Sequence, residues 1–269
     1  MAGSKRLDPG DPETAPETRG TIDVLPTGDA LTEAAAQRFV SAADGAIRAS
    51  GRFVVALSGG STPRSLYGRL STEPHASRVE WPRVHLFWGD ERCVPPDDPG
   101  SNYRMAREVL LDHLPVPEAN VHRIRGEDDP VAAAAAYERE LRETFTTPTG
   151  PPRSIPGARF DLVLLGMGDN GHTASLFPGL AAVRETARWV MAEYIDAVSM
   201  WRVTLSPVVI NAAAQVVFLV SGGAKAGMLR RVIEGPDQPD VLPAQAIAPS
   251  ESRPLWLVDA AAAADLQRK

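Results

Sequence analysis

The sequence contains a single cysteine, Cys93, among its 269 residues. One cysteine excludes an internal disulfide and a cysteine-based metal cluster, and a free thiol fits a reducing compartment. No apolar run approaches the length that spans a membrane. The basic pair Lys5 and Arg6 has no apolar stretch behind it, so a signal peptide is not expected. These absences predict a cytoplasmic protein with no membrane partner.

The chain also lacks an excess of basic residues. It has 28 Lys and Arg against 34 Asp and Glu, a net charge of −6, and no basic stripe, so nucleic acid is not an expected partner. An anionic small substrate would need a local basic pocket that opposes the overall charge. No His-x-x-x-His pair or carboxylate cluster has ligand spacing, so the sequence predicts no bound metal.

The chain is long enough to bury a large core, and 43% of its residues are hydrophobic. Residues 1–20 are rich in Pro, Gly, Asp, Glu and Thr, which predicts a disordered tail. Residues 21–269 are expected to form a single domain. Short apolar runs predict strands at 22–25, 53–57, 84–88, 162–165, 189–194, 202–205, 216–220 and 255–258.

Helical spacing predicts helices between these strands, at 32–49, 64–70, 102–111, 131–145, 207–213 and from 225 to 233, with an alanine-rich helix at the end of the chain. Asp29 is the expected N-cap of the first helix, and Pro63 is expected at the first position of the second. Residues 121–124 are ambiguous, and 146–157 predict a surface loop. The alternation of strands and helices indicates an α/β fold with a doubly wound, mostly parallel sheet.

The stretch 160–178 combines a buried strand with an unusual loop. The apolar run 162–165 is followed by three glycines interspersed with Asp169, Asn170, His172, Thr173 and Ser175. Open α/β sheets bind ligands beyond the carboxyl ends of their strands. His172 can accept a proton near neutral pH and is a candidate base. The alternative is a polar turn that happens to contain a histidine.

Three further loops offer groups that bind anions. Residues 58–62 place Gly59, Gly60, Ser61 and Thr62 directly before a helix, a position suited to phosphate, although a tight turn would have the same composition. Lys225 stands at another helix start, where a cation opposes the helix dipole unless an anion is present. Arg92 could bind phosphate or pair with Asp90 or Glu91, and the role of Arg202 is open in the same way.

The remaining candidates for chemistry have simpler interpretations. His75, His85, His113 and His122 lack polar neighbours in the sequence and are expected to be surface or core histidines. Cys93 has no histidine partner in sequence and is interpreted as a small buried residue.

The chain resembles the glucosamine-6-phosphate isomerase/6-phosphogluconolactonase family, on the lactonase side. The resemblance is carried by residues 56–63, 88–95, 101–102, 166–178, 202–207 and 221–225 in that order. It implies a modified Rossmann-like fold, shared with glucosamine-6-phosphate deaminase and ribose-5-phosphate isomerase. It implies hydrolysis of 6-phosphoglucono-δ-lactone, a phosphorylated sugar lactone, with no cofactor.

The resemblance also implies roles for individual residues. His172 would be the general base, with Asn170 as the second catalytic residue. Position 170 is usually Asp in the family, and an Asn there can orient the imidazole but cannot stabilise its cation with a charge. Substrate would be bound by loop 58–62, Asp90, Arg92 and Lys225, with Arg202 holding sugar or phosphate oxygens.

Two other functions are weighed against lactone hydrolysis. A glucosamine-6-phosphate deaminase would carry a carboxylate in the segment after the histidine, and residues 174–178 contain none. A non-enzymatic sugar-phosphate sensor would need a DNA-binding domain, and residues 1–20 are too short and polar to form one. The oligomeric state, monomer or small homo-oligomer, and the tolerance for other phosphorylated lactones stay open.

Overall fold

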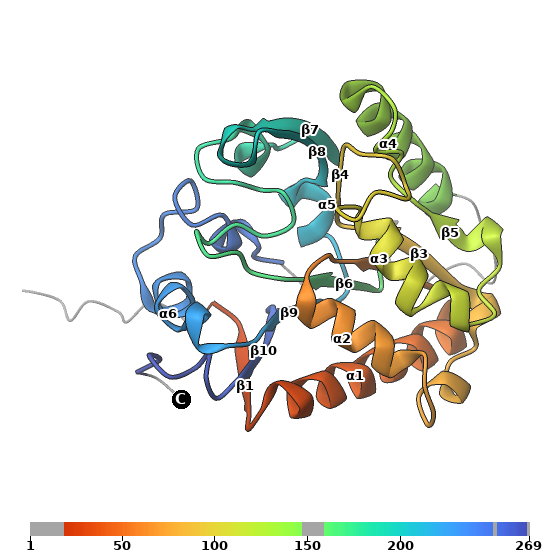
Figure 1. Ribbon diagram of the computed structural model, residues 1–269, viewed down its shortest axis with the longest axis horizontal. Coiled ribbons are helices and arrows are strands. Elements are labelled where there is room, and N and C mark those ends of the chain that lie inside the picture. The colour runs from red at the N-terminus through yellow and green to blue at the C-terminus, as the bar shows by residue number, and fades with distance from the viewer. Residues whose placement is uncertain (1–18, 147–158, 250–251, 268–269) are drawn as a thin grey trace, which may run out of the picture.

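The computed structural model describes residues 19–146, 159–249 and 252–267. Almost all of the expected N-terminal tail, 1–20, and of the expected loop 146–157 lies outside these residues. In the described part, a large sheet crosses the molecule (Figure 1). Helices α1 (Gly28–Ser50) and α2 (Ser61–Leu70) lie on one side of it, and a small second sheet lies on the other side with α4 (Pro130–Thr146).

All strand pairs of the large sheet are parallel, in the order β1-β10-β9-β6-β2-β3-β5. The strands are β1 (Thr21–Leu25), β2 (Phe53–Leu57), β3 (Val84–Trp88), β5 (Val121–His122), β6 (Leu162–Leu165), β9 (Val216–Val220) and β10 (Leu255–Asp259). The remaining α-helices are α3 (Asn102–Val109), α5 (Pro207–Asn211) and α6 (Ala226–Glu234). The predicted α/β fold with a mostly parallel sheet is confirmed.

The strand order reverses direction between β2 and β6. From β2 the chain moves outward through β3 to β5, then returns to β6 on the opposite side of β2 and moves outward again through β9. In open α/β sheets, ligands bind at such a switch point, outside the carboxyl ends of the strands. Here those ends continue into loop 58–62 and into the glycine-rich loop that begins at Gly166.

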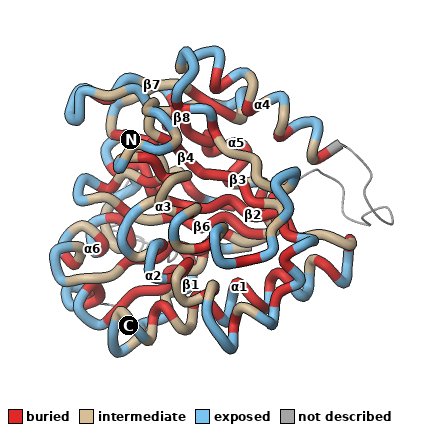
Figure 2. Tube along the Cα trace, turned by 45° about the vertical axis from the view of Figure 1, so that its right-hand side comes forward, coloured by how far each residue is buried: buried red, intermediate tan, exposed pale blue. Residues whose placement is uncertain are grey.

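The core follows from the apolar runs of the central strands. Every residue of β2, β6 and β9 is buried, as expected for strands covered on both faces. Figure 2 shows this buried band running through the middle of the molecule, with exposed residues on the outer faces of the helices. The buried stripe of α1 includes Leu31, Ala35, Phe39 and Ile47, which lie on one helical face.

The small sheet was not predicted. It contains β4 (Asp90–Arg92), β8 (Met200–Leu205) and β7 (Val190–Ile195), and both of its strand pairs are antiparallel. The sequence therefore predicted β7 and β8 correctly as strands but did not distinguish their small sheet from the large parallel one. A short turn that ends at Ser199, with φ of 47°, joins β7 and β8 as a hairpin. A connection this short gives an antiparallel pair, because parallel neighbours need a longer crossover, usually a helix.

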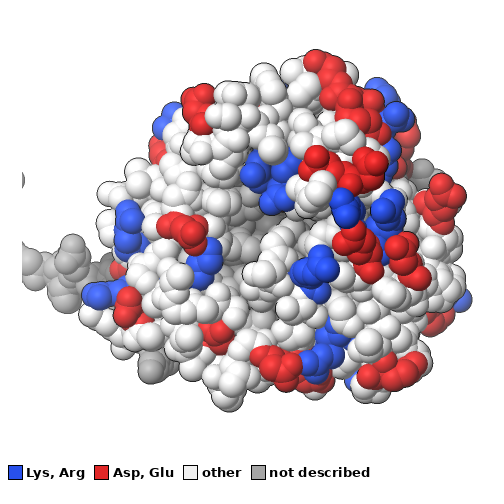
Figure 3. Space-filling view, in the orientation of Figure 1, with Lys and Arg blue, Asp and Glu red and all other residues white. Residues whose placement is uncertain are grey.

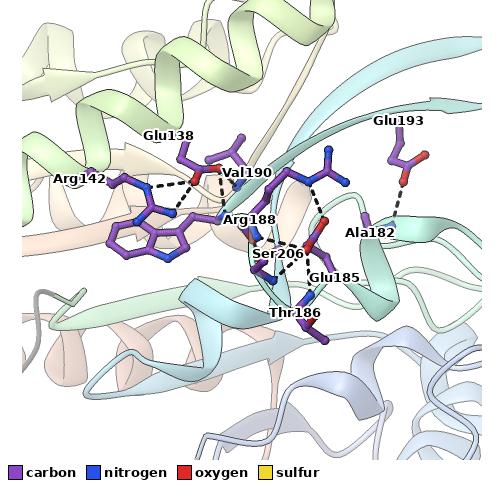
Figure 4. A network of polar contacts seen from close by, with 11 residues as sticks. Glu138, Arg142, Ala182, Glu185, Thr186, Arg188, Val190, Glu193 and Ser206 are labelled. Carbon is purple, nitrogen blue, oxygen red and sulfur yellow. Dashed lines mark hydrogen bonds and ion pairs between the residues drawn. The ribbon is translucent and has the colours of Figure 1, made fainter.

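Helix α4 anchors the start of this hairpin. The Glu138 carboxylate accepts the backbone N–H groups of Trp189 and Val190 at 3.0 and 3.2 Å, and Arg142 donates to the same carboxylate (Figure 4). The Arg142 guanidinium also stacks 4.1 Å above the Trp189 ring. These contacts fix the sheet that carries Arg92 and Arg202.

Several helix ends differ from the prediction. The N-cap of α1 is Thr27, whose hydroxyl accepts the N–H of Ala30, and not Asp29. Helix α2 begins at Ser61, so Pro63 is its third residue and not its first. In the described residues, no helix is both long and apolar enough to cross a membrane.

The predicted C-terminal helix is wrong. Residues 260–265 form turns. The Asp259 side chain accepts the N–H of Ala262, and its backbone carbonyl accepts the N–H of Ala263, four residues on. The bonds that follow, such as Leu266 to Ala263, span only three residues. A segment this short cannot sustain a helix on alanine propensity alone, and burial of Ala262, Ala263 and Leu266 fixes the turns instead.

Candidate active site

A cleft of about 210 Å³ lies at the switch point of the large sheet. It is formed by the loops that follow β2, β3, β6 and β9, together with β8, and Lys and Arg side chains border the hollow in Figure 3. The predicted site residues that line it are Gly59, Gly60, Ser61, Thr62, Asp90, Arg92, His172, Arg202 and Lys225. Asn170 does not line the cleft but contacts His172.

The His172 ring is fixed on two sides. Its Nδ1 lies 2.5 Å from Asn170 Oδ1, and its face stacks on Phe177 with ring centroids 4.1 Å apart. Because an amide oxygen can only accept, Nδ1 carries the proton and Nε2 keeps its lone pair. Burial lowers the pKa of His172 to about 4, and the nearby negative charge of Asp90 opposes this shift in part. The ring is therefore neutral at cellular pH.

Gly168 makes room for this ring. A Cβ at position 168 would stand 2.0 Å from Cε1 and 2.1 Å from Nδ1 of His172, far inside van der Waals contact. The backbone of Gly168 also donates its N–H to the carbonyl of His172 at 2.8 Å. The glycine spacing seen in the sequence thus shapes a tight loop that closes around the imidazole.

Two arginines stand side by side on neighbouring strands of the small sheet. Arg92 on β4 and Arg202 on β8 are register partners of an antiparallel pair. Both line the cleft, and the Nε of each is buried without a hydrogen-bond partner in the described structure. Burial lowers the pKa of Arg202, and the charge of Arg92 contributes to that shift. Like charges opposed in a sheet are unfavourable, so this pair is suited to a shared anion.

Arg92 and Arg202 differ in whether they pair with a neighbouring carboxylate, the alternative to phosphate binding. Arg92 forms no ion pair with Asp90 or Glu91, and its guanidinium donates instead to the carbonyl of Gly100. Arg202 lies 3.8 Å from Asp90 Oδ2, an ion-pair distance that is too long for a hydrogen bond.

Asp90 lines the cleft and is buried, and two other side chains hold it in place. Its Oδ2 accepts the Ser175 hydroxyl at 2.6 Å, and Asn102 donates to its backbone carbonyl at 2.9 Å and to Oδ1 at 3.3 Å. Asn102 in turn packs against Gly59, where a Cβ would stand 2.0 Å from its side-chain oxygen. Ser175 and Asn102 belong to the family-like motifs, but neither had an assigned role.

Lys225 has a carboxylate partner in this structure. Its ammonium group pairs with Asp169, which precedes Asn170 in the glycine-rich loop, and this hydrogen bond lowers the pKa of Asp169. A cation at a helix start was expected to need a nearby anion, and Asp169 supplies that negative charge from within the protein. Lys225 still lines the cleft, and its exposed partner leaves it accessible to a ligand.

The loop after β2 is held at its start by Tyr67, and its far end leads into the start of α2. The Tyr67 hydroxyl donates to the carbonyl of Ser58 and accepts its N–H, both at 2.8 Å. Gly60, with φ of 104°, then turns the chain into α2, and no side chain of the described structure caps this helix start. The free N–H groups of the first turn and the helix dipole favour an anion at this end.

The other histidines lie outside the cleft. His85 Nδ1 contacts His122 Nε2 at 3.1 Å, His122 contacts Glu140, and His75 contacts Glu33. Cys93 is only half-buried rather than buried, and partial burial raises the pKa of its thiol to about 11. In the part of the chain that the structure describes, no three His, Cys, Asp or Glu side chains gather as a metal site.

The fold and the cleft together define a Rossmann-like α/β protein with a cation-lined pocket at its switch point. The family model described as glucosamine-6-phosphate isomerases/6-phosphogluconolactonase matches residues 26–256, and the chain belongs to this family. The resemblance drawn from the sequence motifs is thereby confirmed.

Individual relatives point to the lactonase branch. The 6-phosphogluconolactonase of Nostoc sp. is 40% identical over 91% of this chain and 98% of its own length. The structure of the Trypanosoma cruzi 6-phosphogluconolactonase matches with a TM-score of 0.81 and 30% identity, covering 95% of this chain and all of that one (100%). A monomeric glucosamine-6-phosphate deaminase shares the fold, with a TM-score of 0.74 over 91% of this chain and 99% of that one, at 21% identity.

Proposed function

We propose that the protein hydrolyses 6-phosphoglucono-δ-lactone to 6-phosphogluconate, the second step of the oxidative pentose phosphate pathway. The observation that carries this proposal is the state of His172. Its Nδ1 is held by Asn170 at 2.5 Å, its pKa is about 4, and none of the described residues bonds Nε2. A neutral imidazole with a free nitrogen at the edge of an anion-binding cleft is suited to deprotonate water.

The reaction follows from this geometry. Water gives a proton to Nε2 of His172 while its oxygen attacks the lactone carbonyl, and the resulting tetrahedral intermediate collapses with cleavage of the ring C–O bond. The imidazolium returns its proton to the departing ring oxygen. A positioned base of this kind contributes about 10²–10⁴-fold to the rate. The carboxylate of Asp90 favours the transient imidazolium, because its charge raises the pKa of His172.

The phosphate end of the substrate would lie against the cations of the cleft. Arg92 and Arg202 supply two guanidiniums, loop 58–62 supplies backbone N–H groups, and Lys225 supplies an ammonium. These groups form the local basic pocket that a protein of net charge −6 needs for an anionic substrate. Phosphate binding by arginine forks and helix starts is chemically favourable.

The family also contains glucosamine-6-phosphate isomerases, so deamination is the main competing function. That reaction calls for a carboxylate that can move protons during ring opening. Asp90 is the one carboxylate that lines the cleft in the described residues, and Ser175 and Asn102 already engage it. The segment 174–178, which follows His172, contains no carboxylate for that role, and this favours hydrolysis over deamination.

The test is proton release from freshly prepared 6-phosphoglucono-δ-lactone, measured against spontaneous hydrolysis. The same preparation is assayed in parallel with glucosamine 6-phosphate, with ammonia as the readout. Lactone hydrolysis without ammonia release supports the proposal. Ammonia release, or no acceleration over the spontaneous rate, contradicts it.

A further inference from the structure

The loop that carries His172 is joined to the small sheet through one buried serine. Ser175 is fully buried, at 0% exposure, and lies three residues after His172. Its hydroxyl donates to Asp90 Oδ2 on β4 at 2.6 Å, while its backbone N–H donates to Thr204 Oγ1 on β8 at 3.1 Å. Ser175 therefore contacts both strands that carry the cleft arginines.

The turn before Ser175 needs this support. Ala174 has φ of 46°, a left-handed conformation that side chains other than glycine rarely adopt. Such a conformation persists only when the surrounding contacts determine it. The two bonds of Ser175 fix the loop immediately after this turn against β4 and β8.

Ser175 and Arg202 approach the same oxygen atom. Asp90 Oδ2 accepts the Ser175 hydroxyl at 2.6 Å, and Arg202 Nη1 stands 3.8 Å from it. Arg202 Nε has no partner in the described structure, although it is buried. With the hydroxyl in place, the carboxylate is already satisfied and Arg202 stays at a distance where it can turn to a ligand.

We propose that Ser175 is a positioning residue that keeps Arg202 available to the substrate by occupying Asp90 Oδ2. Without the hydroxyl, the buried carboxylate loses a hydrogen bond to a charged group, and Arg202 is the charged donor nearest to Oδ2. Arg202 then closes onto Asp90 and forms the shorter charge-assisted bond. A substrate anion must break that bond before it can bind. This inference rests on the proposed anion-binding role of Arg202.

The first test is kinetic. Ser175→Ala is expected to raise KM for the lactone about tenfold, the usual effect of losing one charged hydrogen bond, with a smaller change in kcat. Ser206→Ala is the matched control, because Ser206 is equally buried, at 0% exposure, and its hydroxyl donates at the same 2.6 Å, but to the carbonyl of Arg188. The control is expected to lower thermal stability while leaving KM unchanged.

A double-mutant cycle separates positioning from general loosening. An Arg202→Met background lacks the guanidinium that stands 3.8 Å from Asp90 Oδ2. Adding Ser175→Ala there should change KM by less than about twofold. An equal tenfold effect in both backgrounds would overturn the proposal. Should Ser175→Ala fold poorly, Ser175→Cys keeps the side-chain size but is a weak donor, and it should raise KM in the same direction.

The binding of inorganic phosphate, followed by calorimetry, makes the test independent of turnover. Weaker phosphate binding in Ser175→Ala than in the wild type supports the proposal even if the lactone is not the substrate. If the wild type hydrolyses the lactone but Ser175→Ala has unchanged KM and phosphate affinity, the role of Ser175 is wrong and the proposed function stands.

Discussion

Asn170 Oδ1 lies 2.5 Å from His172 Nδ1 and also accepts the backbone N–H of His172 at 3.2 Å. This one side chain thus sets both the tautomer of the imidazole and the shape of the loop. An amide fixes the tautomer but adds no charge, so burial dominates and the pKa of His172 stays low, at about 4. A carboxylate at position 170 would act on the same nitrogen with a full negative charge.

Asn170→Asp should therefore raise the pKa of His172, because a carboxylate at hydrogen-bond distance stabilises the imidazolium. The active form is neutral, so kcat/KM falls when pH drops below this pKa. The acid limb of kcat/KM against pH should move to higher pH in the variant, and activity at alkaline pH should hold or improve. An acid limb in the same place as that of the wild type would show that position 170 does not act on His172.

Substrate without phosphate should react poorly. Arg92 and Arg202 stand side by side as register partners and both line the cleft, an arrangement that an anion stabilises. We expect kcat/KM for glucono-δ-lactone to be lower than for its 6-phosphate by at least about 10²-fold, the value of one or two charged hydrogen bonds. Arg92→Ala should mainly raise KM for the phosphorylated lactone. Similar kcat/KM values for the two lactones would contradict the proposed anion site.

The loop around His172 has no room for a methyl group at position 168. Gly168→Ala should displace the ring, since the new Cβ would stand 2.0 Å from His172 Cε1, and a displacement of about 1 Å can cost about 10²-fold in rate. Gly68→Ala is the control, because nothing lies within 4 Å of a Cβ there and alanine favours the helix. If kcat of Gly168→Ala equals that of the wild type, the ring is not held as described.

These contacts mark the limit of what the sequence alone could predict. Buried strands such as β2 and β6, and the loops that follow them, were predictable because short apolar runs end in glycine and small polar residues. Strand β4 was not, because Asp90, Glu91 and Arg92 are polar and adopt strand geometry only by pairing with β8. Short strands of this kind depend on tertiary context more than on propensity.

The same distinction applies within the site. The sequence could predict His172 as a candidate base and the arginines as candidate anion ligands, because such residues follow or lie near strand ends. The pairing of Lys225 with Asp169 and of Ser175 with Asp90 joins residues 56 and 85 positions apart, so the sequence held no local signal for either. Nor could it show that Arg92 turns to Gly100 rather than to its neighbouring carboxylates.

Acid should destabilise the protein partly through His85. Burial lowers the pKa of His85 to about 4, with His122 and Arg52 adding to the shift, while in the unfolded chain it is near 6.5. The unfolded state then binds more protons between these values, so the free energy of unfolding falls as pH drops from about 6.5 to about 4. His85→Gln should flatten this dependence, measured by urea unfolding at several pH values.

The exposed His113 provides a matched substitution outside the core. Both His85→Gln and His113→Gln should keep activity at pH 7, because neither residue lines the cleft. If His85→Gln retains the full slope between pH 6.5 and 4, the acid sensitivity arises elsewhere.

The central claim is that His172 activates water for attack on a phosphorylated lactone. The most direct measurement is proton release from fresh 6-phosphoglucono-δ-lactone at pH 7, for the wild type and for His172→Ala, with the spontaneous rate subtracted and folding checked by circular dichroism. We expect rapid hydrolysis by the wild type and a kcat lower by about 10²-fold or more in a folded variant. A folded His172→Ala protein with kcat within a few-fold of the wild type would contradict it.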